Sequence, residues 1–147
     1  MSAVELAAGL CRRFEGFFPR PYLCPAGVPT IGFGTTRYED GSRVTLKDPA
    51  IDRARAEELL KWEITRVCVP ALMKFCPSVD TPERAGALLD FVYNLGSGSL
   101  KASTLRRRVN EGDWASVPAE LAKWVYGGGR KLKGLVIRRG AEAALCE

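Results

Sequence analysis

The sequence contains no histidine among its 147 residues, and this absence removes whole classes of chemistry. Without an imidazole there is no Ser-His-Asp or Cys-His catalysis, no histidine metal ligand and no general acid or base of that kind. The chain also lacks a Cys-x-x-Cys pair, and its cysteines form an odd set, namely Cys11, Cys24, Cys68, Cys76 and Cys146. This pattern favours free thiols in a reducing cytoplasm over a disulfide framework or a zinc site. The chemistry must therefore rest on carboxylates, hydroxyls or thiols.

Long apolar runs are absent as well. The apolar stretch before Arg12 is short and is interrupted by Glu5, which is unlike a signal peptide or a membrane span. The sequence therefore predicts neither a cleaved leader nor stable membrane insertion. Hydrophobic residues still make up 46% of the chain, which is enough to close one core, so a single domain is expected over residues 1–147.

Positive charge is abundant, with 22 Lys and Arg against 17 Asp and Glu and a net charge of +5. The excess is concentrated between residues 101 and 139, which hold ten basic and three acidic residues. These basic stretches have three interpretations: solvated helix faces, attraction to an anionic polymer or surface, and nucleic-acid binding. The third ranks last because no nucleic-acid-binding motif accompanies the charge.

A helix and then a small sheet are predicted in the first third of the chain. Apolar residues recur at helical spacing between residues 6 and 14, and Gly16 is expected to end the helix directly after Glu15. From Pro19 to about Asp48, glycines and prolines separate short apolar runs, which predicts a two- or three-stranded antiparallel sheet. Its first tight turn is expected at residues 24–27.

The remainder of the chain has a helical pattern. An apolar stripe predicts a long helix near residues 52–74, in which Pro70 is expected to produce a kink or an end. Thr81 is the expected cap of a well-defined helix that runs to Gly96. Three more helices are predicted, from residue 100 or 103 to 110, from 113 to about 125, and from 132 or 133 to 145, the last after a glycine loop at 127–129.

This order of elements predicts an α+β fold with two lobes. The sheet-bearing lobe is expected at about residues 15–50 and the helical lobe at about 75–147, with the first helix packed on the helical lobe. The long helix joins the two lobes, and a cleft between them is expected to hold a polymer.

The spacing of Glu15, Cys24 and Thr30 is the main chemical signal. A carboxylate at a helix end, followed by a reactive side chain and a hydroxyl on a glycine-rich turn and strand, is a layout that a sugar-cleaving site can use. Such cleavage needs a carboxylic acid that is still protonated near neutral pH. The helix C-terminus and the nearby phenylalanines disfavour the charged form of Glu15. Taken singly, each residue also fits a structural role, as an exposed helix-end Glu, a small turn residue or a strand-forming Thr.

Together with the segment Gly32-Phe33-Gly34, this triplet resembles the phage-type lysozymes, the endolysins of the T4-lysozyme-like glycoside hydrolase family. The resemblance implies a lysozyme-like fold. It continues through the second half of the chain in the same order, at residues 91–96, 103–105, 110–114, 124, 128–129 and 134–139.

The resemblance implies an endolysin that hydrolyses the β-1,4 bond between N-acetylmuramic acid and N-acetylglucosamine of bacterial peptidoglycan and so lyses the host cell. Glu15 would be the proton donor, and Thr30 would orient the hydrolytic water. Cys24 stands where many relatives have Asp, and because a free thiol has a pKa of about 8.5 its role stays open between water placement, charge stabilisation and nucleophilic attack. The expected substrate-binding residues are Tyr22, Phe33, Asn94, Ser97 and Gly98.

The resemblance further implies no cofactor or metal, a monomer, no nucleic acid as a partner, and accumulation in the host cytoplasm until a holin permeabilises the inner membrane. Arg138 is expected to reach across to Glu15. Relatives often have His where this chain has Thr35, and with Cys24 this departure keeps alternatives open. One is a lytic transglycosylase, which uses the same acid without water and forms 1,6-anhydro products. The other is a non-catalytic basic domain that binds the wall or nucleic acid.

Overall fold

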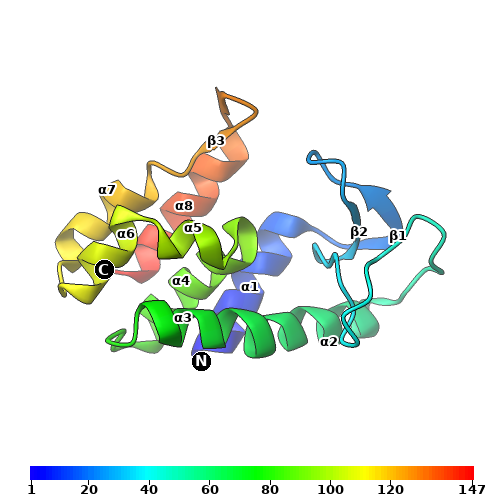
Figure 1. The fold of residues 1–147 in the computed structure, drawn as a ribbon, viewed down its shortest axis with the longest axis horizontal. Helices are drawn as coiled ribbons and strands as arrows, with labels where there is room; N and C mark the ends of the chain where they lie inside the picture. The colour runs from blue at the N-terminus through cyan, green and yellow to red at the C-terminus, as the bar shows by residue number, and fades with distance from the viewer.

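A long helical segment connects the two parts of the molecule in the computed structural model, which describes residues 1–147. It consists of α2 (Arg53–Glu63), the π-helical turn η1 (Ile64–Cys68) and α3 (Val69–Phe75), which follow one another without a break. Figure 1 shows this segment running along the lower side of the molecule from the β-strands to the other helices. In η1 the N–H of Val69 bonds the carbonyl of Ile64, five residues back, and Pro70 then lies in the first turn of α3. The predicted connecting helix is confirmed, and Pro70 follows a change of helix type and does not end the helix.

The first helix and the small sheet also form as predicted. Helix α1 (Ala3–Glu15) begins after Ser2, whose side chain accepts from the N–H of Glu5, and ends at Gly16 with φ of 73°. Strands β1 (Phe18–Leu23) and β2 (Pro29–Gly32) pair antiparallel, with Tyr22 opposite Thr30. Two isolated antiparallel bridges, Ile31 with Thr35 and Arg37 with Arg43, add further backbone pairing after β2.

The remaining helices are α4 (Pro82–Leu95), α5 (Ser97–Lys101), α6 (Thr104–Asn110), α7 (Val117–Leu121) and α8 (Lys133–Leu145). Thr81 and Ser103 cap α4 and α6 as side-chain acceptors, as the sequence predicts for their starts. The predicted helix from 113 to about 125 is shorter, because a 3-10 turn, η2 (Trp114–Ser116), precedes α7 and the helix stops at Leu121. The glycine loop contains a second, unpredicted hairpin of β3 (Tyr126–Gly127) and β4 (Arg130–Lys131).

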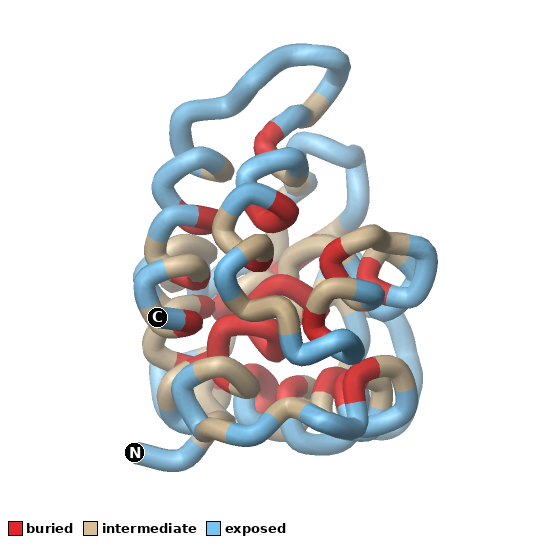
Figure 2. Tube along the Cα trace, turned by 90° about the vertical axis from the view of Figure 1, so that its left-hand side faces the viewer, coloured by how far each residue is buried: buried red, intermediate tan, exposed pale blue.

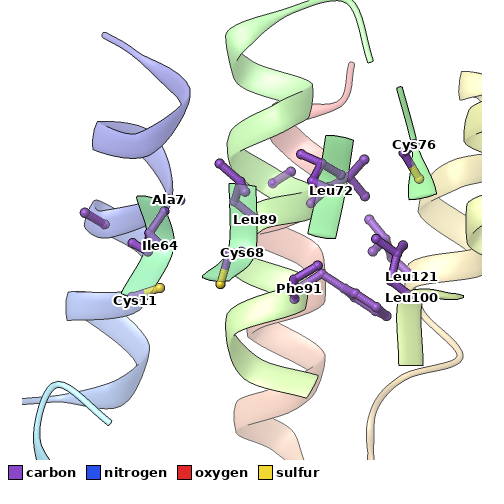
Figure 3. Packing of buried hydrophobic residues seen from close by; sticks show 14 of the residues in the cluster. Ala7, Cys11, Ile64, Cys68, Leu72, Cys76, Leu89, Phe91, Leu100 and Leu121 are labelled. Carbon is purple, nitrogen blue, oxygen red and sulfur yellow. The ribbon is translucent and has the colours of Figure 1, made fainter. Parts of the chain in front are cut away.

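The hydrophobic core surrounds α4, which packs against α1, α8 and the η1–α3 segment, and it continues into α5, α6 and α7. Figure 3 shows Cys11 of α1 and Ile64 of η1 on one side of α4, while the ring of Phe91 reaches toward Leu100 and Leu121 on the other. In Figure 2 the buried positions gather in the interior, and exposed positions form the outer turns and loops. All five cysteines are free thiols, and four of them are buried. The α+β fold with a small antiparallel sheet is confirmed. None of the helices combines the length and the apolar character that a membrane span requires.

Candidate active site

Glu15 is the last residue of α1, and its side chain is 21% exposed. Arg138 of α8 donates from Nη1 to Oε2 of Glu15 at 2.7 Å, so the predicted contact between these residues is confirmed. On the other side of the carboxylate lies Gly34, where an added Cβ would stand only 2.8 Å from Oε1 of Glu15. The carboxylate is therefore held between α8 and the loop that follows β2.

A buried positive charge lies beside Glu15. The side chain of Arg138 is only 4% exposed, so its charge is screened little by water where it meets the carboxyl. Arg138 comes from a helix 123 positions away in the sequence, and such a neighbour is settled by tertiary packing.

A second carboxyl, Glu63, lies at the end of α2 near this site. Burial, together with the negative charge of Glu15, raises the pKa of Glu63 to about 7 from an ordinary value of 4.5. The sequence analysis did not single out Glu63. Its available signal was an acidic residue directly before Ile64, which belongs to the predicted buried stripe.

Cys24 and Thr30 are brought together by the β1–β2 hairpin. Thr30 is 3% exposed, and its hydroxyl donates to the carbonyl of Val28 at 2.8 Å, which leaves lone pairs of the hydroxyl oxygen as acceptors. The pKa of the Cys24 thiol is lowered, chiefly by hydrogen bonding with the backbone at Val28, and the hydroxyl of Thr30 acts in the same direction. Tyr22 lies in the same surroundings. Burial is the main cause that raises the pKa of its hydroxyl, and the negative charges of Glu15 and Cys24 raise it further.

The five expected substrate-binding residues have different surroundings. Tyr22 stacks against Phe18 with ring centroids 4.3 Å apart, and Asn94 accepts at Oδ1 from Arg139 at 2.8 Å. Ser97 and Gly98 are exposed at the start of α5.

Phe33 corrects the expectation for the fifth residue, because it is 1% exposed and belongs to the hydrophobic core. Its ring packs near that of Phe17, and its carbonyl accepts from the hydroxyl of Tyr93 at 2.5 Å. An aromatic residue next to a glycine in a predicted strand is compatible with a core position as well as with a cleft. In the structure the ring of Phe33 lies in the core.

Thr35, which follows Gly34, stabilises a tight turn through its backbone. It exchanges both backbone hydrogen bonds with Ile31, each 2.9 Å long, and is 1% exposed. Both bonds are between main-chain atoms, so the turn next to Gly34 forms without a contribution from the side chain at position 35.

An apolar hollow of about 260 Å³ lies away from Glu15, between α7 and α8. None of its lining residues carries a carboxylate, so this hollow offers no acid for bond cleavage. The residues that line it are Pro118, Ala122, Val125, Lys131, Val136, Arg139, Gly140 and Ala143.

Comparison with known proteins assigns this arrangement to a class. The family described as Phage lysozyme matches residues 12–142. The chain is 34% identical over 133 residues to a SAR-endolysin of Bacteriophage PS119, covering 90% of this chain and 75% of the relative. The solved endolysin from Escherichia coli O157:H7 phage FAHEc1 superimposes with a TM-score of 0.85 and 29% identity over 99% of this chain and 92% of that one. The muramidase domain of SpmX from Asticaccaulis excentricus gives a TM-score of 0.74 and 27% identity, over 95% and 92%.

These likenesses define a lysozyme-like protein, with an acid at the end of the first helix facing a small β-hairpin. The match extends over most of the sequence. The chain belongs to the phage lysozyme family.

Proposed function

We propose that this chain is an endolysin that hydrolyses the β-1,4 bond between N-acetylmuramic acid and N-acetylglucosamine in bacterial peptidoglycan. Membership of the phage lysozyme family supports a peptidoglycan-cleaving enzyme, and the similar proteins include endolysins and a muramidase domain. The observation that carries the proposal is the half-buried carboxylate of Glu15, paired with Arg138 and lying against Gly34 beside the β1–β2 hairpin.

Glu15 is the proton donor in the proposed reaction. Its proton passes to the glycosidic oxygen while the bond from that oxygen to the anomeric carbon breaks and the bonding electrons stay with the oxygen. Glu15 then carries a negative charge, which the guanidinium of Arg138 stabilises at 2.7 Å. Glu15 is also the last residue of α1, so the negative partial charge of the helix C-terminus lies beside its carboxyl.

Thr30 and Cys24 act on the water in this proposal. The hydroxyl of Thr30 already donates to Val28, so it accepts a hydrogen bond from the water and fixes its orientation. The water oxygen bonds to the anomeric carbon, and a proton released from the water restores the acid form of Glu15. The lowered pKa of Cys24 increases the fraction of thiolate. A thiolate is suited to charge stabilisation or nucleophilic attack, in addition to placing the water.

The proposed substrate contacts are Tyr22, Asn94, Ser97 and Gly98, of which Ser97 and Gly98 are exposed. The charged sugar polymer is the proposed partner, and nucleic acid is not. We further propose that the protein acts as a monomer on the wall in the periplasm, which it reaches from the host cytoplasm after a holin has opened the inner membrane.

Lysis of permeabilised Gram-negative cells, followed as loss of turbidity, tests the role of Glu15. Glu15→Gln is expected to lower the rate by roughly 10²- to 10⁴-fold, because the amide has no acidic proton to give. Glu5→Gln is the matched control, since Glu5 lies exposed on the same helix, and its rate should stay within about twofold of wild type. Equal rates for wild type and Glu15→Gln would contradict the proposal.

Mass spectrometry of the released fragments distinguishes the reaction types. Reducing N-acetylmuramic acid ends that carry the oxygen of labelled water are expected from hydrolysis. Fragments with 1,6-anhydro ends would identify a lytic transglycosylase instead. Binding to purified walls without any released fragment would identify a non-catalytic wall-binding domain.

A further inference from the structure

Behind Glu15, the guanidinium of Arg138 is clamped by a buried carboxylate on a third helix. Asp90 of α4 accepts from Nε of Arg138 at 2.9 Å and from Nη2 at 2.8 Å, a two-pronged contact. Asp90 is 0% exposed and Arg138 is 4% exposed. The clamp occupies one edge of the guanidinium and leaves Nη1 to donate to Glu15.

A further carboxyl, Glu142 of α8, interacts with Asp90. Glu142 is 0% exposed, and burial followed by its interactions with Asp90 raises its pKa well above the ordinary value. The protonated carboxyl of Glu142 is a hydrogen-bond donor to Asp90. Burial also raises the pKa of Asp90, but hydrogen bonds with Arg138 and Glu142 outweigh it and lower the pKa overall. The thiol of Cys11 is another donor to Asp90, at 3.3 Å.

Arg139 lies beside Glu142 in the same cluster. Its Nη2 donates to Oε2 of Glu142 at 2.9 Å, and its Nε lies 2.8 Å from Oε1. Arg139 is 2% exposed, so this contact is buried next to the clamp between Asp90 and Arg138.

We propose that Asp90 is a positioning residue for the proposed cleavage reaction: it fixes the guanidinium of Arg138 so that Nη1 faces the carboxyl of Glu15. This inference rests on the proposed function, in which Glu15 becomes negatively charged as it gives up its proton. A free arginine side chain samples many rotamers, whereas a planar guanidinium held along one edge presents its remaining N–H groups in a fixed direction. The stabilising group is then in place before the reaction, and no reorganisation is needed as charge develops.

Asp90 itself is out of reach of any substrate because it is fully buried on α4. Its effect on the reaction must therefore pass through Arg138. This separates its expected kinetic signature from that of a residue that contacts the glycan.

Asp90→Asn is the test, assayed on a soluble peptidoglycan fragment. The amide keeps the shape of the side chain but supplies one acceptor oxygen where the clamp needs two, so Arg138 loses one of its bonds. We expect kcat to fall by about 10- to 100-fold, with KM within about twofold of wild type, because the misplaced group acts on the reacting acid and not on substrate binding. The alkaline limb of the kcat–pH profile should move up, because the positive charge beside the reacting acid has moved away.

Glu142 gives a graded comparison. Glu142→Gln retains an N–H donor toward Asp90, and Glu142→Ala does not. Glu142→Ala is therefore expected to lose more of kcat than Glu142→Gln does.

A matched control separates positioning from loss of stability. Leu121→Ala opens a cavity in the core at α7, removes none of the hydrogen bonds of Arg138, and should lower the melting temperature without moving the pH profile. A folded Asp90→Asn protein with wild-type kcat and pH profile would overturn the inference. If Asp90→Asn does not fold, Arg138→Lys decides: it keeps the charge but loses the two-pronged contact, and a wild-type kcat–pH profile would overturn the inference equally.

Glu15→Gln is measured in parallel so that a failure of the proposed function can be distinguished from a failure of the role given to Asp90. Full activity of Glu15→Gln would overturn the proposed function. Loss of activity in Glu15→Gln combined with an unchanged kcat–pH profile in Asp90→Asn would overturn only the role of Asp90.

Discussion

Arg138 and Glu15 stand 123 positions apart in the sequence, yet Nη1 of the arginine lies 2.7 Å from Oε2 of the glutamate. The pair joins the end of α1 to the middle of α8, and Asp90 of α4 holds the same guanidinium from behind. The candidate acid is thus supported by three helices, α1, α4 and α8, and the loop after β2 approaches it at Gly34.

Gly34→Ala is expected to abolish most of the activity. Gly34 has φ of +85°, and an added Cβ would stand 2.8 Å from Oε1 of Glu15, so the carboxylate has to move. A displacement of this kind at a reacting group costs about 100-fold in rate. The lysis rate on permeabilised cells measures the effect.

Gly41→Ala is the matched control for this substitution. Gly41 has the same φ of +85°, and an added Cβ there meets no atom within 4 Å. Both substitutions impose the same backbone strain, so a difference in rate between them reports the contact with Glu15. Similar losses in both variants would contradict the role given to Gly34.

Cys24→Asp and Cys24→Ser distinguish the possible roles of the thiol. Because the pKa of Cys24 is lowered, we expect a charged role, so Asp should retain activity and Ser should lose roughly tenfold or more. In wild type the rate should rise as the pH approaches the pKa of the thiol, and this rise should be absent in Cys24→Asp. Wild-type activity in Cys24→Ser would instead indicate that the side chain only places the water.

Glu63 is expected to make stability depend on pH. Its pKa of about 7 in the folded protein exceeds the ordinary 4.5, so the folded state holds this proton more tightly than the unfolded state does. The contribution of Glu63 to the free energy of unfolding is complete below about pH 4.5 and is lost as the pH rises through 7. Glu63→Gln should remove this decline and leave the variant more stable than wild type above pH 7 by roughly 1–3 kcal/mol.

Urea unfolding between pH 4 and pH 9 measures the effect of Glu63. Glu58→Gln is the control, since the Glu58 side chain lies on the same helix and is 67% exposed. A decline of equal size in wild type and Glu63→Gln would rule Glu63 out as its source.

Gly86→Ala and Gly9→Ala should change stability in opposite directions. Gly86 lies where α4 meets α1, and an added Cβ would stand 2.8 Å from Cβ of Leu6, so packing strain of about 1–3 kcal/mol is expected. At Gly9 the nearest atom is the end of a flexible arginine at 4.0 Å, and Ala should stabilise the helix by about 0.5–1 kcal/mol. Thermal unfolding of both variants tests this, and equal shifts would contradict the close approach of α1 and α4.

The features that were predictable from sequence depend on neighbours along the chain. Gly16 ends α1, and Thr81 and Ser103 cap their helices, because each cap is a contact within a few residues. The triplet spacing is of the same kind, since the hairpin alone brings Cys24 to Thr30.

The features that were missed depend on parts of the chain that are distant in sequence. The positions of Asp90 and Glu63 look like ordinary helix positions until α8 and α1 pack against them. Phe33 fits a cleft or a core equally well from its strand pattern, and the hydroxyl of Tyr93 on α4 and the ring of Phe17 decide for the core. The β3–β4 hairpin was not predicted, because its glycine-rich segment has no strand pattern in the sequence. It is defined by the backbone pairing of the two short strands.

The placement of the acid on the first helix and of its cationic partner on the last has a consequence for biosynthesis. A ribosome that has made only the front of this polypeptide has delivered the hairpin and the acid, but nothing to neutralise or orient that acid. The candidate site is expected to be complete only after α8 has been made and has packed against α4.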